Sequence, residues 1–73
     1  MNEKEIVREL MKIRGLTQAE LSKKAGYSYQ SAISSILCRQ SIRTDTLVQL
    51  AEAMECEVVV RAKDDSHEWV IRY

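Results

Sequence analysis

The sequence predicts a mainly α-helical domain in which four short helices are followed by a C-terminal β-hairpin. Three observations lead to this fold class. Apolar residues recur at helical spacing from the N-terminus to about Met54. Between Thr17 and Leu37, two short helical patterns are joined at a single glycine. From Glu57 onwards the pattern changes to dense β-branched residues and alternation, which is typical of strands.

The outer helices are expected from the spacing of their apolar residues. The first runs from about Glu3 to Arg14, and the glycine that follows ends it. Its apolar stripe is expected to contain Ile6, Val7, Leu10, Met11 and Ile13. The last helix begins near Thr44 and runs to about Met54, with Asp45 favourable at its positive N-terminus. Its expected buried residues are Leu47, Leu50, Ala51 and Met54.

The second helix carries its own start and stop signals. Thr17 and Glu20 have the spacing of a capping box, in which each side chain bonds the backbone N–H of the other residue. Leu21 and Ala25 lie four residues apart and therefore share one face. Gly26 follows at the point where a left-handed backbone is needed to end the helix.

The third helix is expected to begin near Ser28, whose hydroxyl offers an N-cap. Its buried stripe is expected to be Ile33, Ile36 and Leu37. Two helices joined by a tight turn containing Gly form the unit that places a recognition helix in the DNA major groove. The alternative is an ordinary pair of packed helices in a small helical protein, because capped helix pairs are common.

These patterns resemble the lambda-repressor and Cro type of helix-turn-helix, often called the XRE family. The resemblance covers about residues 4–56. In the helix pair it is carried by Thr17-Gln18, Glu20-Leu21, Ala25-Gly26, Ser28, Ile33-Ser34 and Ile36. In the last helix it is carried by Asp45-Thr46-Leu47, Leu50-Ala51 and Ala53-Met54.

The chain departs from the family pattern in three places. Ser22 stands where the family usually has Ala, at the close contact between the two helices. One extra residue between Gly26 and Ile33 shifts the turn or the start of the recognition helix. The segment Leu37–Gln40 lacks the Glu-x-Gly that usually follows that helix. The second departure affects which positions read bases, and none of the three argues against the fold.

The last 17 residues are expected to form the hairpin, with strands within 57–63 and 67–73 around the turn-forming Asp64-Asp65-Ser66. An isolated hairpin is marginally stable and exposes unpaired backbone groups at its edges. Pairing with the same strand of a second copy would make a four-stranded sheet around a twofold axis, a design found in Cro-type proteins and some antitoxin repressors that this core resembles. The alternative is a hairpin that only covers its own helices. The residues expected to form the dimer interface are Val58, Val60, Trp69, Ile71 and Tyr73.

Length and charge fit one small domain with a polyanion-facing side. The 73 residues are 45% hydrophobic and 30% charged, which argues against disorder. Residues 1–43 hold eight Lys or Arg and four Asp or Glu, a net charge of +4. Residues 44–73 hold three basic and seven acidic residues, a net charge of −4. The basic part therefore contains the helix pair, as expected for a nucleic-acid-binding face, although a chance split of so few charges remains the alternative.

The sequence predicts neither an enzyme nor a membrane protein. Cys38 and Cys56 lack CxxC spacing and, with the single His67, cannot supply four zinc ligands. No catalytic constellation, phosphate-binding glycine loop or cofactor site stands out, so no metal and no cofactor are expected. The charged N-terminus and the lack of a long apolar run predict a cytoplasmic protein.

The expected function is that of a DNA-binding transcriptional regulator, most simply a repressor that binds a palindromic operator on double-stranded DNA as a homodimer. The alternative is an antitoxin that binds a toxin protein and also its own promoter. Residues 1–56 are expected to form the DNA-binding part, and residues 57–73 a dimerisation element of the same domain. The expected base-reading residues are Tyr29, Gln30, Ser31 and Ser35. The expected phosphate contacts are Gln18, Arg39 and Arg43, with Lys23 and Arg14 as weaker candidates.

Overall fold

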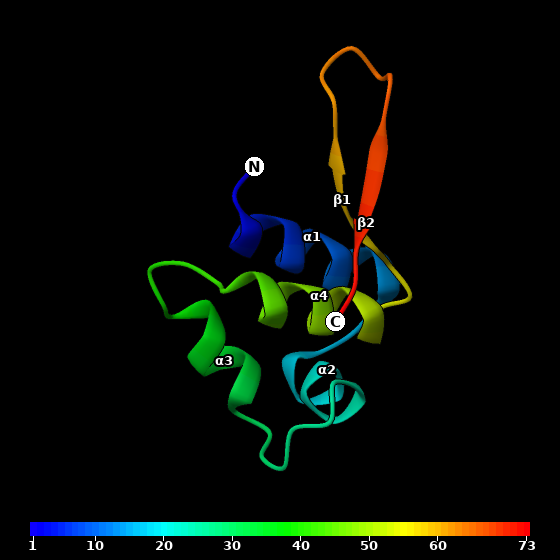
Figure 1. Cartoon of the computed structure of the whole chain (residues 1–73). Helices are drawn as coiled ribbons and strands as arrows, with labels where there is room; N and C mark the ends of the chain where they lie inside the picture. Colours follow the sequence, from blue (N-terminus) through cyan, green and yellow to red (C-terminus); the bar gives the residue numbers. More distant parts are fainter.

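The computed structural model describes residues 1–73 and has the predicted mainly helical architecture. Its elements in chain order are α1 (Glu3–Arg14), α2 (Gln18–Lys24), α3 (Ala32–Leu37), α4 (Thr44–Ala53), β1 (Val58–Arg61) and β2 (Glu68–Ile71). Figure 1 shows α1 and α4 across the middle of the molecule, with α2 and α3 on one side and the hairpin projecting on the other. The predicted fold class, four helices followed by a C-terminal hairpin, is confirmed.

Helix α1 has the predicted bounds but buries a narrower face than predicted. The side chain of Asn2 accepts a hydrogen bond from the Glu5 N–H at its start, and Gly15 adopts a left-handed φ of 66° at its end. Val7 and Met11 face the core, whereas Ile6 and Ile13 are 40% and 66% exposed. Because an α-helix turns by about 100° per residue, Ile6 and Ile13 both lie more than ~100° away from the direction shared by Val7 and Met11. The predicted stripe was therefore too wide.

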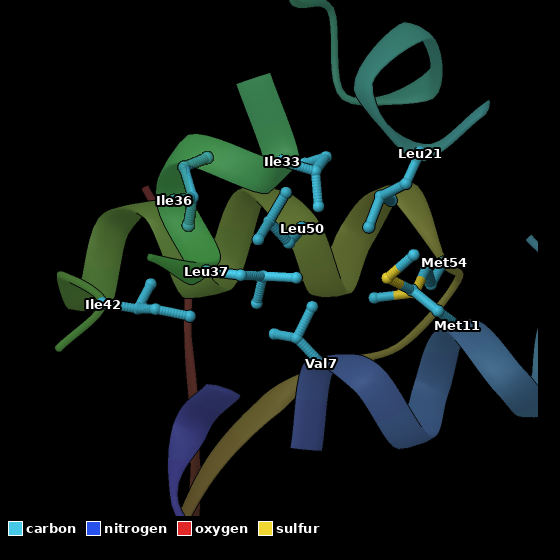
Figure 2. Close-up of a cluster of buried hydrophobic side chains, with 9 residues drawn as sticks. All are labelled: Val7, Met11, Leu21, Ile33, Ile36, Leu37, Ile42, Leu50 and Met54. Carbon is cyan, nitrogen blue, oxygen red and sulfur yellow. The ribbon is translucent and has the colours of Figure 1, made fainter. Parts of the chain in front are cut away.

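One hydrophobic cluster joins all four helices (Figure 2). The figure shows the side chains of α1, α3 and α4 meeting between the helices, with Leu21 of α2 entering from the side. Its buried members are Val7, Met11, Leu21, Ile33, Ile36, Leu37, Ile42, Leu50 and Met54. Within α4, Val48 is buried although the sequence pattern favoured Leu47, which is only half-buried. The cluster fixes α2 and α3 against the pair α1 and α4.

The hairpin is antiparallel, and its register gives two distinct faces. Val58 pairs with Ile71 and Val60 with Trp69, so these four side chains share one face, which we call the Trp69 face. Val59 pairs with Val70 on the opposite face. Both faces are open to solvent: Val60 and Trp69 are 53% and 58% exposed, and Val59 is 41% exposed. Among the strand residues, only Val58 and Ile71, at the base of the hairpin, are half-buried.

Asp64 organises the turn at the tip of the hairpin. Its carboxylate accepts hydrogen bonds from the Ser66 N–H at 3.0 Å and from the Ser66 hydroxyl at 2.6 Å. These two bonds hold the pKa of Asp64 below its usual value. Asp65 takes a left-handed φ of 63°, a conformation that Asp tolerates better than most residues. None of the four helices is long and apolar enough to cross a membrane.

Candidate nucleic-acid interface

The predicted capping box at the start of α2 is present. Thr17 Oγ1 accepts a hydrogen bond from the Glu20 N–H at 3.1 Å, and Glu20 Oε1 accepts one from the Thr17 N–H at 2.9 Å. The hydrogen bonds from Thr17 stabilise the ionised carboxylate and so hold the pKa of Glu20 below its usual value. Gln18 is the first residue of the helix and is exposed, in the position predicted for a phosphate contact.

The end of α2 also follows the prediction. Gly26 adopts a left-handed φ of 87°, and its N–H donates to the Lys23 carbonyl at 3.1 Å. The next N–H, that of Tyr27, donates to the Ser22 carbonyl at 3.0 Å. This pair of bonds is a Schellman motif, which satisfies carbonyls that the helix end would otherwise leave free. The glycine therefore turns the chain out of α2 towards the next element.

The predicted start of the recognition helix was wrong. Helix α3 begins at Ala32, not near Ser28, and has only six residues. The chain between the two helices is a seven-residue loop, residues 25–31, which we call the entry loop. Tyr29, Gln30 and Ser31 therefore lie ahead of the helix, and of the predicted base-reading residues only Ser35 lies on it. The segment between Gly26 and Ile33, where the sequence pattern indicates one extra residue, falls almost entirely in this loop.

The entry loop is fastened to the helical body at both ends. At its start, the side-chain amide of Gln49 donates to the Ala25 carbonyl at 2.7 Å, and the Tyr27 hydroxyl donates to Gln49 Oε1 at 3.3 Å. Partial burial raises the pKa of Tyr27. At its end, the Ser22 hydroxyl bonds the backbone on both sides of the helix start. The loop is therefore anchored rather than free.

The side chains between these anchors face solvent. Tyr29 is 55% exposed, and Gln30 and Ser31 are exposed as well. A shallow depression of about 220 Å³ runs between α2 and the entry loop. Lys23, a predicted phosphate contact, lines this depression together with Tyr29 and Gln30, two predicted base-reading residues.

The exposed side of α3 is polar, and sequence reasoning did not include all of it. Ala32, Ile33, Ile36 and Leu37 are buried. Ser34 is exposed beside Ser35, and Cys38 is exposed directly after the helix. Ser31, Ser34 or Ser35, and Cys38 repeat every three to four residues, a spacing that places them on one side. That periodicity was available in the sequence as the complement of the buried stripe.

The predicted phosphate-contacting arginines differ in their surroundings. Arg39 is exposed and its side chain forms no ion pair, while its backbone carbonyl accepts a hydrogen bond from Lys4 Nζ at 2.9 Å. Arg43 lies 3.2 Å from Asp45 in a solvent-exposed ion pair. Such pairs contribute at most about 1 kcal/mol, so Arg43 can exchange its partner for another anion. Lys4 lies beside the segment between α3 and α4, and the sequence analysis did not single it out as a phosphate contact.

Arg14 is turned towards the protein instead. Its Nε donates to the Met54 carbonyl at 3.0 Å, at the C-terminal end of α4. Lys4 and Arg14 lie ten residues apart on α1, a distance of about 15 Å at 1.5 Å per residue. Arg14 therefore sits at the opposite end of α1 from Lys4 and the Arg39 carbonyl that Lys4 contacts.

Ion pairs sharpen the charge asymmetry seen in the sequence. In the hairpin, Arg61 pairs with Asp65 at 3.2 Å and Arg72 approaches Glu57 to 3.5 Å. Of the eight basic residues in 1–43, only Arg43 forms an ion pair. Most basic side chains free of a carboxylate partner therefore belong to the part of the chain that contains α2 and α3.

Comparison with known proteins agrees with this geometry. The family model described as Helix-turn-helix matches residues 7–60, which include all four helices except the start of α1. The chain belongs to the helix-turn-helix family of the lambda-repressor and Cro type. No curated protein and no solved structure matches the chain.

Family membership assigns the general role of the two short helices. This helix-turn-helix protein is a DNA-binding transcriptional regulator, and its family is one of regulators rather than enzymes. In such a unit the second helix is the one that enters the major groove. Here that helix is α3, preceded by the entry loop, and its exposed side carries hydroxyl groups rather than charges.

Proposed function

We propose that this helix-turn-helix regulator is a repressor that binds a palindromic operator as a homodimer. The observation that carries the proposal is the hairpin, which projects from the helical body opposite α2 and α3 (Figure 1). Most of its large apolar side chains are exposed to solvent. Val60 and Trp69, paired neighbours on one face of the hairpin, are 53% and 58% exposed, and contiguous exposed apolar patches mark interaction sites.

A second copy is the partner that fits these features. The hairpin has only two strands, so each strand leaves one edge of backbone N–H and C=O groups without a partner. Pairing such an edge with its symmetry mate satisfies both copies at once, because a twofold interface uses the same residues twice. The residues proposed for this interface are Val58, Val60, Trp69, Ile71 and Tyr73.

The proposed dimer makes a specific statement about the operator. A single six-residue α3 with its entry loop contacts few base pairs. Two copies related by a twofold axis place their recognition helices about 34 Å apart, which is one turn of DNA. The operator is therefore expected to be an inverted repeat with half-site centres about 10 base pairs apart.

Base reading is proposed for the entry loop and the exposed side of α3, that is for Tyr29, Gln30, Ser31 and Ser35. Gln30 is the strongest candidate, because the amide of Gln can bond N6 and N7 of one adenine together. The Gln30→Ala variant should lose about 1–3 kcal/mol of binding free energy at the cognate site and relax specificity there. Equal losses on cognate and scrambled duplexes would contradict this role.

Phosphate contacts are proposed for Gln18, Arg39, Arg43 and Lys23, with Arg14 weakened as a candidate by its bond to α4. The Arg39→Gln variant should bind every duplex more weakly and lower the slope of log affinity against log salt by roughly one. Arg61→Gln is a matched control, because this arginine is also exposed but lies in the hairpin beside Asp65. A change of slope in the control equal to that of Arg39→Gln would contradict the assignment.

The proposed function is tested by selecting bound sequences from a random duplex pool and by sedimentation of the free protein. An inverted repeat together with a dimer at tens of micromolar supports the proposal, a concentration that is an order-of-magnitude threshold for specific association. Val60→Lys, on the Trp69 face, should weaken the dimer more than Val59→Lys, its neighbour on the opposite face. A monomer at this concentration, or a selected site without symmetry, would contradict the homodimer.

A second candidate function is that of an antitoxin, because the same exposed Trp69 and Tyr73 side chains suit binding to a toxin protein instead of a second copy of the chain. It predicts that the chain co-purifies with the product of a neighbouring reading frame. It also predicts that this product competes with self-association through the Trp69 face. Retention of the homodimer in saturating amounts of that product would favour the repressor without a toxin.

A further inference from the structure

Ser22 joins α2 to the entry loop and to the start of α3 through three hydrogen bonds. It is 1% exposed and is the only buried polar residue of the chain. Its hydroxyl donates to the Gln30 carbonyl at 3.1 Å and accepts from the Ile33 N–H at 3.3 Å. Its own carbonyl accepts from the Tyr27 N–H at 3.0 Å. One residue of α2 therefore holds the entry loop at Tyr27 and Gln30, and the first turn of α3 at Ile33.

The bond from Ile33 replaces a cap that α3 lacks. The first N–H groups of any helix have no partner within the helix and need one from elsewhere. Ser31 occupies the N-cap position, but its side chain makes no capping bond. The Ser22 hydroxyl accepts from the second N–H of the helix instead, which is a position that an N-cap side chain commonly serves. The cap of α3 thus comes from another helix.

The bond from the Ser22 hydroxyl to the Gln30 carbonyl fixes the backbone that carries the Gln30 side chain. The Gln30 side chain is exposed, while its carbonyl is held by a buried hydroxyl. A backbone held in this way leaves the side chain fewer directions in which to project, so less freedom is lost when it meets a base. Such pre-ordering strengthens contacts that require a defined geometry, and base-edge contacts are of that kind.

We propose that Ser22 is a positioning residue for base reading: its hydroxyl sets the entry loop and the first turn of α3 in the arrangement that specific DNA binding needs. The proposal rests on the proposed function, because it assigns the readout to Gln30 and its neighbours. It differs from a role in folding alone in one measurable respect. Loss of the hydroxyl should lower the preference for the cognate duplex, not only the melting temperature.

The Ser22→Ala variant separates these two effects well. Alanine fits the space of the serine side chain, and it has a higher helix propensity than serine, which offsets part of any loss of stability in α2. The variant leaves the Ile33 N–H and the Gln30 carbonyl without their bonds to Ser22. Ser66→Ala is a matched control, because it also removes a serine hydroxyl bond, at 2.6 Å to Asp64, but in the hairpin turn.

The test uses the full chain, a duplex selected by the wild type from a random pool, and a scrambled duplex of the same composition. Ser22→Ala should lower the ratio of cognate to scrambled affinity about tenfold, the order expected for loss of one to two hydrogen bonds. In Ser22→Ala, amide exchange at Ile33, followed by NMR, should accelerate. Ser66→Ala should leave both the ratio and the Ile33 exchange rate unchanged.

Two results would overturn the inference. The first is a Ser22→Ala variant that stays folded and keeps the wild-type affinity ratio. The second is an unchanged rate of exchange at Ile33. If Ser22→Ala does not fold, Ser22→Cys takes its place, since a thiol of similar size is a much weaker donor and acceptor. A folded Cys variant with the wild-type ratio and exchange rate would then overturn it. A wild type that binds all duplexes equally would instead overturn the proposed function, and with it any part of Ser22 in base reading.

Discussion

The helical body and the hairpin of this regulator treat their apolar residues in opposite ways. All thirteen buried residues lie between Val7 and Met54, and none belongs to the hairpin. The hairpin is as rich in Val, Ile and Trp as a core strand, yet most of these side chains are in solvent. The body therefore has a core of its own, whereas the hairpin carries apolar surface that the single chain does not cover.

Core substitutions should show this contrast most strongly. Leu50 is fully buried at the centre of the cluster in Figure 2, so Leu50→Ala should lower the free energy of unfolding by about 2–5 kcal/mol. A domain of this size has only a marginal total stability, so much of the variant should be unfolded. Trp69→Ala should leave the stability of the monomer nearly unchanged. Urea denaturation at low protein concentration measures both, and equal losses would contradict the division.

Removal of the hairpin is the second test. A chain that ends at Cys56 keeps every member of the hydrophobic cluster and should retain helical circular dichroism and a cooperative thermal transition. It should sediment as a monomer and bind the selected operator much more weakly than the full chain. An unfolded truncated chain would show that Val58 and Ile71, the half-buried residues at the base of the hairpin, belong to the core.

Loss of a local cap should also destabilise the helical body when the cap lies in a helix and not when it lies in the hairpin. The expected effects are smaller than those of the core substitution. Thr17→Ala removes half of the capping box of α2 and should cost about 1 kcal/mol of unfolding free energy. Asp64→Ala removes the two bonds that organise the hairpin turn and should leave the thermal transition of the body in place. Differential scanning calorimetry of both variants measures this, and a lower transition temperature for Asp64→Ala would couple the hairpin to the body.

The smallest expected effect is a pH dependence from the same capping box. The pKa of Glu20 is lower in the folded chain than in the unfolded chain because Thr17 bonds the ionised form. The unfolded state therefore binds its proton first as the pH falls. The stabilisation is complete above the unfolded pKa and is lost as the pH falls through the lower folded pKa. The free energies of unfolding of the wild type and of Glu20→Gln, measured by denaturation between pH 7 and 3, should converge as the pH falls.

Local signals predicted the fold well, and contacts between distant segments explain what they missed. The bounds of α1, the capping box at Thr17, the left-handed Gly26 and the hairpin around Asp64 all depend on residues within a few positions of one another. The face of α1 that is buried depends on where α4 lies, which its own spacing does not define. The start of α3 was misplaced because it too depends on contacts with segments that are distant in the sequence.

The candidate site was predictable only as a set of residue types. Polar residues near α3 and basic residues in the first 43 positions can be read from the sequence. Ser22 could be recognised there as a departure from the family pattern, but not as a cap. Its bonds reach eight residues to Gln30 and eleven to Ile33, and no local pattern encodes them. The turn of Arg14 towards Met54 spans forty residues and was equally hidden.

A contact surface that lies outside the core separates folding from assembly. In the proposed dimer, each copy can fold alone at low abundance and join its partner later, without unfolding. The concentration of dimer then rises with the square of the monomer concentration while the dimer is scarce. Occupancy of the operator inherits this steepness. Because dimerisation depends on the exposed hairpin, occupancy of the operator would respond steeply to the concentration of the protein in the cell.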